Sequence, residues 1–358
     1  MKSRIVHIVG SGTIGEPLIH LFLKHARDLG IDEVTFHKNS PNSNDRGKIS
    51  RLLAAGGKLV CDESKFDSFK VLGFLPSYST EEAVSRSTVV IDATPADTGL
   101  QNKESLYSKY DDGSRLFIAQ GSEFGFGHMY AYGINDETLK NLKSRFVHIV
   151  SCNTHSIASI LKTLASSPDG KSMSLLKHGS FVCMRRATDV GEKKSISSPE
   201  VGVHKDQKFG THHARDAYYL FKTRGFDLPL FSSSVKINTQ LMHTLWFHLS
   251  LNESITLDEV RQRVVENKQL SITQKASASE VFQIGRTHGF KGRILNHSVV
   301  PLQTLSVAPE GRDIFGYAFT PQDGNALLSS VAAAAWFLTG DTWPEKMKAF
   351  SRHYLPEV

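Results

Sequence analysis

The stretch Ile5-Val6-His7-Ile8-Val9-Gly10-Ser11-Gly12-Thr13-Ile14-Gly15 decides the fold of the first part of the chain. Its first five residues are an apolar run typical of a buried strand, and its glycines have the spacing GxGxxG. A helical pattern of apolar residues follows and ends near Gly30, and a second strand is expected at residues 33–36. Strand, glycine turn, helix and strand in this order predict a βαβ unit with parallel strands.

The three glycines each have a distinct role in such a unit. Gly10 permits a tight turn, Gly12 lets the backbone approach a pyrophosphate, and Gly15 lets the helix pack closely on the strand. The phosphates would lie at the helix N-terminus, beside Thr13 and Ile14, where free N–H groups favour anions. We therefore predict a dinucleotide-binding turn; a simple glycine-rich turn is the alternative.

The end of the second strand bears on the choice between NAD and NADP. A site that prefers NAD has Asp or Glu here to hold the ribose 2′-hydroxyl, but the chain reads Phe36-His37-Lys38-Asn39-Ser40. Lys38 is a cation where a 2′-phosphate would lie. We predict that NADP is the preferred cofactor and that NAD is possible. The alternative is that Lys38 is an ordinary exposed lysine.

Two further strands, at residues 88–95 and 115–121, end in small or polar residues that include Thr94 and Gly121. Parallel strands end in this way where their carboxyl ends face a cofactor crevice. Alternating strands and helices predict a doubly wound (Rossmann) sheet over residues 1–151, so the fold class is α/β in this part.

A cysteine follows the last strand of this domain. The stretch Ser151-Cys152-Asn153-Thr154 lies between a strand-like run at 145–150 and a helix-like run at 156–162. A helix N-terminus carries partial positive charge and free N–H groups, so we expect Cys152 to ionise more readily than an ordinary cysteine. The alternative is that Cys152 is a small buried apolar residue.

The pattern changes after Cys152. Strands are expected at 179–186, ending in Arg185-Arg186, in a run from 235 through 249, and at 299–302 and 314–319. They predict an α+β domain with a mixed or antiparallel sheet over residues 152–320. The segment 321–358 holds an alanine-rich helix at about 325–338, ended by Gly340, and we expect it to return to the first domain.

Three histidines in this domain attract attention. A loop is expected to hold His212-His213, for which an anion-binding role competes with local hydrogen bonding; no HExxH or CxxC motif supports a metal, so no metal is predicted. A cysteine nucleophile needs a base or acid partner, and His243 is one candidate among several.

Composition excludes several classes of protein. The 358 residues have a net charge of +6 spread along the chain, with no nucleic-acid recognition motif, so cationic sites for phosphorylated substrates or cofactors are favoured. No apolar run approaches the length of about 18 residues that a membrane span needs. Three cysteines without paired spacing and no signal peptide predict a reducing cytoplasmic location.

Taken together, these residues resemble the archaeal-type (type II) glyceraldehyde-3-phosphate dehydrogenases over most of the chain. The matching segments occur in the same order along both sequences: Gly12-Thr13-Ile14-Gly15, Val90 to Pro95, Gln120-Gly121, Ser151 to Thr154, Arg185-Arg186-Ala187-x-Asp189, His212-His213, Leu241-Met242-His243 and the segment around Gln322.

The resemblance implies an NAD(P)-dependent phosphorylating aldehyde dehydrogenase. Cys152 would form a thiohemiacetal and then a thioester, and inorganic phosphate would release 1,3-bisphosphoglycerate, a step of glycolysis and gluconeogenesis. By the same resemblance His243 is the catalytic histidine, and a homotetramer is expected. The positions that match substrate contacts are Ser151, Asn153, Thr154, His212 and His213; those that match cofactor contacts are Thr13, Ile14, Gly121, Arg185, Arg186 and Gln322.

Three departures from the family pattern leave the substrate open. The family commonly has Thr-Gly-Leu after the Asn, where this chain has Thr154-His155-Ser156-Ile157, and Gly-Pro-Asp after the paired histidines, where it has Ala214-Arg215-Asp216. Residues 164–177 form an expanded segment. Two alternatives therefore remain: a related acyl-phosphate-forming semialdehyde dehydrogenase, and a cofactor-binding protein without catalysis.

Overall fold

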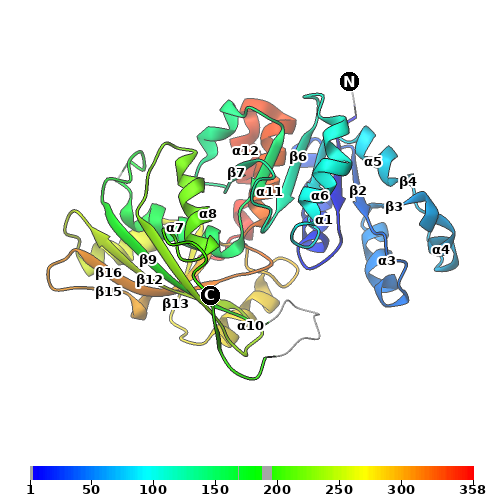
Figure 1. The fold of residues 1–358 in the computed structure, drawn as a ribbon. Coiled ribbons are helices and arrows are strands. Elements are labelled where there is room, and N and C mark those ends of the chain that lie inside the picture. Colours follow the sequence, from blue (N-terminus) through cyan, green and yellow to red (C-terminus); the bar gives the residue numbers. More distant parts are fainter. Residues whose placement is uncertain (1–2, 168, 188–195) are drawn as a thin grey trace. The chain divides into compact units, whose positions relative to one another are not determined.

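The computed structural model describes residues 3–167, 169–187 and 196–358 (Figure 1). The chain forms two compact units, and neither is continuous in sequence. Unit 1 comprises the chain up to Tyr130, Leu139–Ile149 and Leu327–Ser351; unit 2 comprises Ala131–Thr138, Val150–Ala326 and Arg352–Val358. Of the segment 321–358, expected to return to the first domain, Leu327–Ser351 belongs to unit 1, whereas residues 321–326 and Arg352–Val358 belong to unit 2.

Unit 1 is built on a parallel sheet of eight strands in the order β4-β3-β2-β1-β5-β6-β8-β7. The strands are β1 (Ile5–Val9), β2 (Glu33–His37), β3 (Lys58–Cys61), β4 (Tyr78–Ser79), β5 (Val89–Asp92), β6 (Leu116–Gln120), β7 (His128–Tyr130) and β8 (Phe146–Ile149). The order reverses between β1 and β5, and such a reversal opens a crevice at the carboxyl ends of the strands. The predicted doubly wound sheet is confirmed.

The helices of unit 1 include one that comes from the far end of the chain. Helix α11 packs against β5, β6 and β8, and Figure 1 shows it in red beside the cyan β6. Four consecutive alanines of this helix, Ala332 to Ala335, are fully buried. Their small side chains let the helix pack closely on the sheet. The helices are α1 (Gly15–Lys24), α2 (Ala26–Leu29), α3 (Arg46–Ala54), α4 (Phe66–Val71), α5 (Thr80–Arg86), α6 (Thr98–Ser105), α11 (Leu327–Thr339) and α12 (Trp343–Lys348).

Unit 2 is built on a mixed sheet in the order β10-β11-β9-β12-β16-β14-β13, with β15 paired to β16. Two pairings, β11 with β9 and β13 with β14, are parallel, and the other pairings are antiparallel, so the predicted α+β class is confirmed. The strands are β9 (Leu176–Arg185), β10 (Glu200–Val201), β11 (Leu230–Lys236), β12 (His243–Leu251), β13 (Leu270–Thr273), β14 (Ser298–Pro301), β15 (Ser306–Val307) and β16 (Asp313–Thr320).

The single strand expected from residue 235 through 249 is wrong. Strand β11 ends at Lys236 and β12 begins at His243. Both strands pair with β9, one in parallel and one antiparallel, so residues 237–242 must carry the chain across the end of β9. The polar residues of this connection gave no sign of the break because they continued the alternating pattern.

One face of this sheet is covered by α7, which packs against β9, β12, β14 and β16. Along β12, buried residues alternate with half-buried ones, and on the second face Trp246, Phe315 and Tyr317 keep part of their surface exposed. The helices of unit 2 are α7 (Cys152–Ala165), α8 (His212–Lys222), α9 (Leu257–Glu266) and α10 (Ala278–His288). Across the described ranges of both units, no helix combines the length and apolar character needed to cross a bilayer.

Candidate active site

The three glycines of the turn in unit 1 differ in their surroundings: two are required by packing, and one is open to a ligand. A Cβ on Gly10, which has φ +96°, would lie 2.9 Å from the carbonyl oxygen of Ala93, and one on Gly15 would lie 2.0 Å from that of Gly10. Gly12 is different: among the described residues, no atom lies within 4 Å of a Cβ built there. The fold therefore requires Gly10 and Gly15, whereas Gly12 leaves its backbone open to an approaching group, as a pyrophosphate site demands.

Thr13 and Ile14 complete this turn. Ile14 precedes the first residue of α1, and both side chains are half-buried. The first turn of the helix thus presents backbone N–H groups beside the open position at Gly12, which is the arrangement that binds phosphate.

A buried carboxylate organises the neighbouring strand end. Asp92, 2% exposed at the end of β5, accepts hydrogen bonds from the backbone N–H of Thr94 (3.0 Å) and from its hydroxyl. The other oxygen of Asp92 accepts from Asn102 Nδ2 (2.8 Å) and Tyr107 OH (2.6 Å). Thr94 is therefore held rigidly at the crevice edge. Gly121, with φ +89°, follows β6 and is likewise at this edge.

Lys38, just after β2, belongs to a charged cluster. Its Nζ lies 2.8 Å from Asp45 Oδ2, and Lys48 Nζ lies 3.2 Å from Asp45 Oδ1. Lys48 also donates to the carbonyl of Ser11 in the glycine turn (3.1 Å). Desolvation would raise the pKa of Asp45, but the hydrogen bonds from the two lysines hold it below its ordinary value. Sequence reasoning missed Lys48 and Asp45, which reach this point from the segment after Lys38.

Cys152 is the first residue of α7, so the predicted strand-to-helix junction is confirmed. Ser151 is the N-cap, and its Oγ accepts from the N–H of Thr154 (3.4 Å) and lies 2.9 Å from the Thr154 hydroxyl. Ser151 and Thr154 thus shape the first turn that carries the thiol.

The expectation that Cys152 ionises readily is wrong. Burial, followed by the nearby carboxylate of Asp323, raises the pKa of the Cys152 thiol to about 12. Arg186, the N–H of Asn153 and Arg185 act in the opposite direction but do not compensate. Desolvation of the charged form outweighs the helix N-terminus here, because a buried thiolate loses hydration that the partial positive charge of the helix end does not replace. The residue as a whole is half-buried.

His243 is the first residue of β12 and is 4% exposed. Its Nδ1 accepts a hydrogen bond from the backbone N–H of Arg186 (2.9 Å). Because Nδ1 accepts, the proton of the neutral ring is on Nε2, and His243 can offer this N–H as a hydrogen-bond donor. Arg186 itself is almost fully buried, and its guanidinium lies 3.4 Å from the carboxylate of Asp323.

His212 and His213 begin helix α8, which corrects the expectation that they lie in a loop. Burial, then the cations of Arg185 and Arg215, lower the pKa of His212 to about 4. Burial, then His212, Arg185 and His243, lower the pKa of His213 well below its ordinary value. Both rings are therefore neutral near pH 7, and the positive charge of this region comes from the arginines.

His213 connects a buried hydrogen-bond chain to Asn153, the residue after Cys152. Asn153 Nδ2 lies 3.2 Å from His213 Nε2, and His213 Nδ1 lies 3.0 Å from the Thr211 hydroxyl. Thr211 in turn lies 2.6 Å from Ser232 Oγ. Asn153 is 4% exposed, and within the described part of the chain its Oδ1 has no hydrogen-bond partner. A buried acceptor in this state is costly unless a ligand supplies a donor.

The turn after β16 contacts the first residue of α7. It contains Gln322, followed by Asp323 with φ +59°, and Asn325, whose Nδ2 donates to the carbonyl of Cys152 (2.9 Å). Asp323 and Asn325 escaped sequence reasoning, since neither belongs to a recognisable motif.

The expected site residues thus gather into two sets. Unit 1 holds Gly10, Gly12, Thr13, Ile14, Gly15, Lys38, Thr94 and Gly121, and unit 2 holds Ser151, Cys152, Asn153, Thr154, Arg185, Arg186, His212, His213, His243 and Gln322. Asp189, part of the arginine motif, lies outside the described residues.

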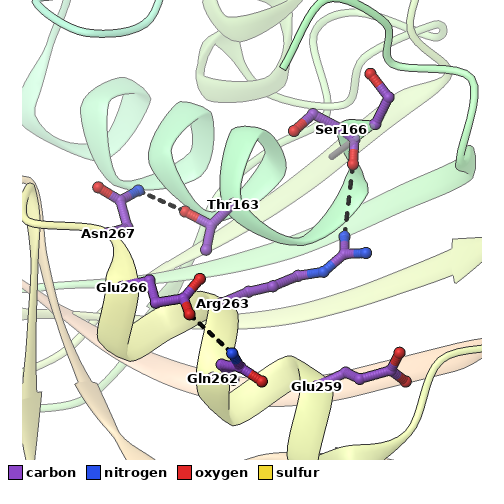
Figure 2. Close-up of a pocket in the computed structure, with 8 residues that line it drawn as sticks. Thr163, Ser166, Glu259, Gln262, Arg263, Glu266 and Asn267 are labelled. Carbon is purple, nitrogen blue, oxygen red and sulfur yellow. Dashed lines mark hydrogen bonds between the residues drawn. The ribbon is translucent and has the colours of Figure 1, made fainter. Parts of the chain in front are cut away.

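A separate cavity of about 430 Å³ in unit 2 lies between α7 and α9. Figure 2 shows its polar lining already joined by internal hydrogen bonds: Asn267 to Thr163, Gln262 to Glu266, and Arg263 to the carbonyl of Ser166. None of the expected site residues lines it. Over the stretches that the structure describes, no three His, Cys, Asp or Glu side chains gather in a way that could hold a metal ion.

Comparisons with known proteins agree with the resemblance noted in the sequence. No protein-family model matches the chain. The chain is 26% identical over 278 residues to a glyceraldehyde-3-phosphate dehydrogenase of Pyrobaculum islandicum, covering 76% of this chain and 73% of that protein. It is 27% identical over 317 residues to the enzyme of that name from Methanopyrus kandleri, covering 84% and 83%. It is 26% identical over 321 residues to that from Sulfolobus acidocaldarius, covering 87% and 85%.

Among solved structures, the fold is similar to that of a probable aspartate-semialdehyde dehydrogenase from Pseudomonas aeruginosa. The TM-score is 0.64 over 94% of this chain and 99% of that chain, with 10% sequence identity. At that identity the likeness concerns the fold alone. The resemblance to the archaeal glyceraldehyde-3-phosphate dehydrogenases is one of sequence. It covers most of the chain and does not depend on this structural likeness.

Proposed function

We propose that this protein is an NAD(P)-dependent, phosphorylating aldehyde dehydrogenase with Cys152 as its nucleophile, and that glyceraldehyde 3-phosphate is its substrate. The observation that carries the proposal is the position of Cys152, which opens α7 between the N-cap Ser151 and the buried amide of Asn153. The archaeal relatives named glyceraldehyde-3-phosphate dehydrogenase support the choice of substrate.

The chemistry of the thiol follows from its surroundings. With a pKa of about 12, Cys152 is protonated near neutral pH, so sulfur adds to the aldehyde carbon as the thiol proton is transferred. The product is a thiohemiacetal, whose oxygen has received that proton. His243, with its proton on Nε2, would donate a hydrogen bond to the oxygen as negative charge develops there.

Oxidation and phosphorolysis complete the cycle. When bound, NAD(P) would supply the hydride acceptor. Loss of a hydride to it and of the hydroxyl proton to solvent would convert the thiohemiacetal to a thioester of Cys152. An oxygen of inorganic phosphate then attacks the thioester carbon, the Cys152 sulfur leaves and regains a proton, and the acyl phosphate is released. For glyceraldehyde 3-phosphate that product is 1,3-bisphosphoglycerate.

The cofactor site proposed for unit 1 uses its glycine turn and strand ends. Gly12 has the open backbone that a pyrophosphate needs, and Thr94 and Gly121 lie at strand ends of the crevice edge. Lys38 and Lys48 share a single carboxylate, Asp45, so one positive charge remains for a 2′-phosphate. This excess supports NADP as the preferred cofactor, with NAD possible.

The substrate's phosphate is assigned to the cationic end of unit 2. Neutral His212 would donate an N–H group, and His213, whose Nε2 accepts from Asn153 Nδ2, would hold the Asn153 amide for the substrate. Arg215 would supply charge if its guanidinium turns from Asp216, which it now contacts at 2.9 Å. Because Arg215 is already paired with Asp216, its charge is less available to a phosphate. This favours a second candidate, a related semialdehyde dehydrogenase whose substrate carries a different anionic group.

The part-exposed face of the unit 2 sheet supports a homo-oligomer, which we propose to be a tetramer. Trp246, Phe315 and Tyr317 share this face, and aromatic side chains are enriched where subunits meet. Sedimentation velocity would test it: Trp246→Lys should yield smaller species, and a monomeric native protein would contradict it.

The activity is tested at 340 nm with glyceraldehyde 3-phosphate, NADP or NAD, with and without phosphate. We expect phosphate-dependent reduction that disappears in Cys152→Ser. Phosphate-dependent reduction with a semialdehyde instead would favour the second candidate. No reduction with any aldehyde, together with NADPH binding that is unchanged in Cys152→Ser, would indicate a binding protein without catalysis.

A further inference from the structure

The turn after β16 is fastened to the residue that carries the nucleophile. Asn325 is fully buried, and its Nδ2 donates to the carbonyls of Cys152 and His297, each at 2.9 Å. These two bonds connect the segment 321–325 to the first turn of α7 and to the segment that leads into β14. The position of Asp323, two residues before Asn325, is therefore set with respect to Cys152.

Asp323 adopts an uncommon backbone conformation in this turn. Its φ of +59° lies in the left-handed region, which few residues other than glycine occupy, although Asp and Asn are the most tolerant of them. A residue in this state persists only where the surrounding structure holds it. Its carboxylate Oδ1 lies 3.4 Å from the NH2 group of Arg186, whose side chain is 2% exposed.

Among the described residues, three charged groups act electrostatically on the thiol of Cys152. Arg185 and Arg186 come from the end of β9, and Asp323 comes from the turn after β16. Two nearby groups of the described residues are neutral near pH 7: Cys183 of β9, whose pKa burial raises to about 12, and His213 of α8, whose pKa burial lowers. His243 of β12 accepts a hydrogen bond at Nδ1.

We propose that Asp323 competes with the Cys152 thiolate for the guanidinium of Arg186, and thereby adds to the burial that keeps the resting nucleophile a neutral thiol. Asp323 is in this sense a positioning residue: it acts on Cys152 through charge, without itself bonding to the substrate. The inference rests on the proposed role of Cys152 as the nucleophile.

The electrostatics of the thiol agree with this competition. After burial, Asp323 is the largest contribution that raises the pKa of Cys152, and Arg186 is the largest that lowers it. Because the thiolate is the species that reacts with electrophiles, a protonated resting thiol reacts slowly with reagents that lack the contacts of a bound substrate. The carboxylate would thus protect the nucleophile between turnovers.

The test is the rate at which iodoacetamide alkylates Cys152 in the full-length protein at fixed pH between 7 and 9. Peptide mass spectrometry distinguishes Cys152 from the buried Cys61 and Cys183. Neither aldehyde nor cofactor is present, so the result does not depend on the dehydrogenase assay: either can fail while the other succeeds.

Two variants that break the same ion pair should move the rate in opposite directions. Asp323→Asn removes the negative charge and should accelerate alkylation about tenfold, the effect of a pKa lower by about one unit. Arg186→Gln removes the positive charge and should slow it by a similar factor. Loss of structure alone would expose the thiol and accelerate alkylation in both variants.

A matched control removes the same charge elsewhere in unit 2. Asp313→Asn, at the start of β16, breaks a pair with His248 (2.7 Å) and should leave the alkylation rate within about twofold of the native rate, because exposed charges interact weakly over distance. If Asp323→Asn does not fold, Asp323→Gly removes the carboxylate while accepting the positive φ. The proposal is overturned if Asp323→Asn reacts at the native rate, if both ion-pair variants react faster, or if the control matches Asp323→Asn.

Discussion

Replacing Gly12 by alanine should separate the needs of the fold from the needs of the cofactor. Gly12 has no positive φ, and in the described part of the chain no atom lies within 4 Å of the new Cβ. Alanine loses less backbone freedom on folding than glycine, so the Gly12→Ala variant should gain about 0.4–1 kcal/mol in free energy of unfolding. A pyrophosphate that lies against this backbone would meet the methyl group.

The expected loss of cofactor affinity follows from overpacking. Forcing one methyl group into a filled contact costs about 1–3 kcal/mol, which corresponds to roughly a 5- to 150-fold rise in Kd. Gly15→Ala is the matched control, since its Cβ would lie only 2.0 Å from the carbonyl oxygen of Gly10. Carbon and oxygen normally approach to about 3.3 Å, so Gly15→Ala must displace the backbone and lower the melting temperature.

The assay pairs fluorescence titration with NADPH and thermal unfolding of the same samples. We expect Gly12→Ala to melt at or above the native temperature and to bind NADPH weakly, whereas Gly15→Ala melts lower. Native affinity in Gly12→Ala would refute the reasoning, because the open position would then not face the pyrophosphate. A lower melting temperature for Gly12→Ala would show that the fold itself needs this glycine.

Three further predictions concern charges. Asp45→Asn should tighten NADPH binding relative to NADH by up to about fivefold, since it frees Lys38 and Lys48 from an ion pair worth up to about 1 kcal/mol; an unchanged ratio of the two dissociation constants from titration would place the 2′-phosphate elsewhere. Arg215→Ala should raise the KM for the aldehyde or for phosphate more than about tenfold in steady-state kinetics, in line with the roughly 1.5–3 kcal/mol of hydrogen bonds to charged groups; an unchanged KM would remove Arg215 from the site. Burial raises the pKa of Asp216 to about 6 against the effect of Arg215, so the native state binds the proton more tightly than the unfolded chain, and stability should increase as pH falls from 7 towards 4. The difference in urea midpoint between the native protein and Asp216→Asn should therefore shift in favour of the native protein over that range, and a constant difference would contradict the raised pKa.

Local patterns in the sequence sufficed for features whose causes are local. The GxGxxG turn, the end of β2 without an acid, and Ser151 as the cap before Cys152 each depend on neighbouring residues and are read directly from their order. Strand and helix types followed from the period of apolar residues. The break between β11 and β12 was missed, because it depends on which strand each one pairs with and not on its own composition.

The ionisation of Cys152 could not be predicted from local sequence patterns. Position at a helix N-terminus is visible in sequence and favours the thiolate, but burial and the carboxylate of Asp323 reverse the outcome. Asp323 lies far along the chain from Cys152, and the hydrogen bonds of Asn325 bring it there. The same holds for Lys48 at the glycine turn and for the bond from Arg186 to His243.

The amino-acid sequence by itself therefore determined the two classes of sheet, the glycine turn and the position of Cys152 at a helix start, because periodicity and capping act between near neighbours. Only the tertiary structure decided the charge state of that cysteine and the proton position on His243, because desolvation and electrostatic interaction depend on distance in space. Residues remote in sequence, such as Asp323 and Arg186, contribute to them only after the chain has folded.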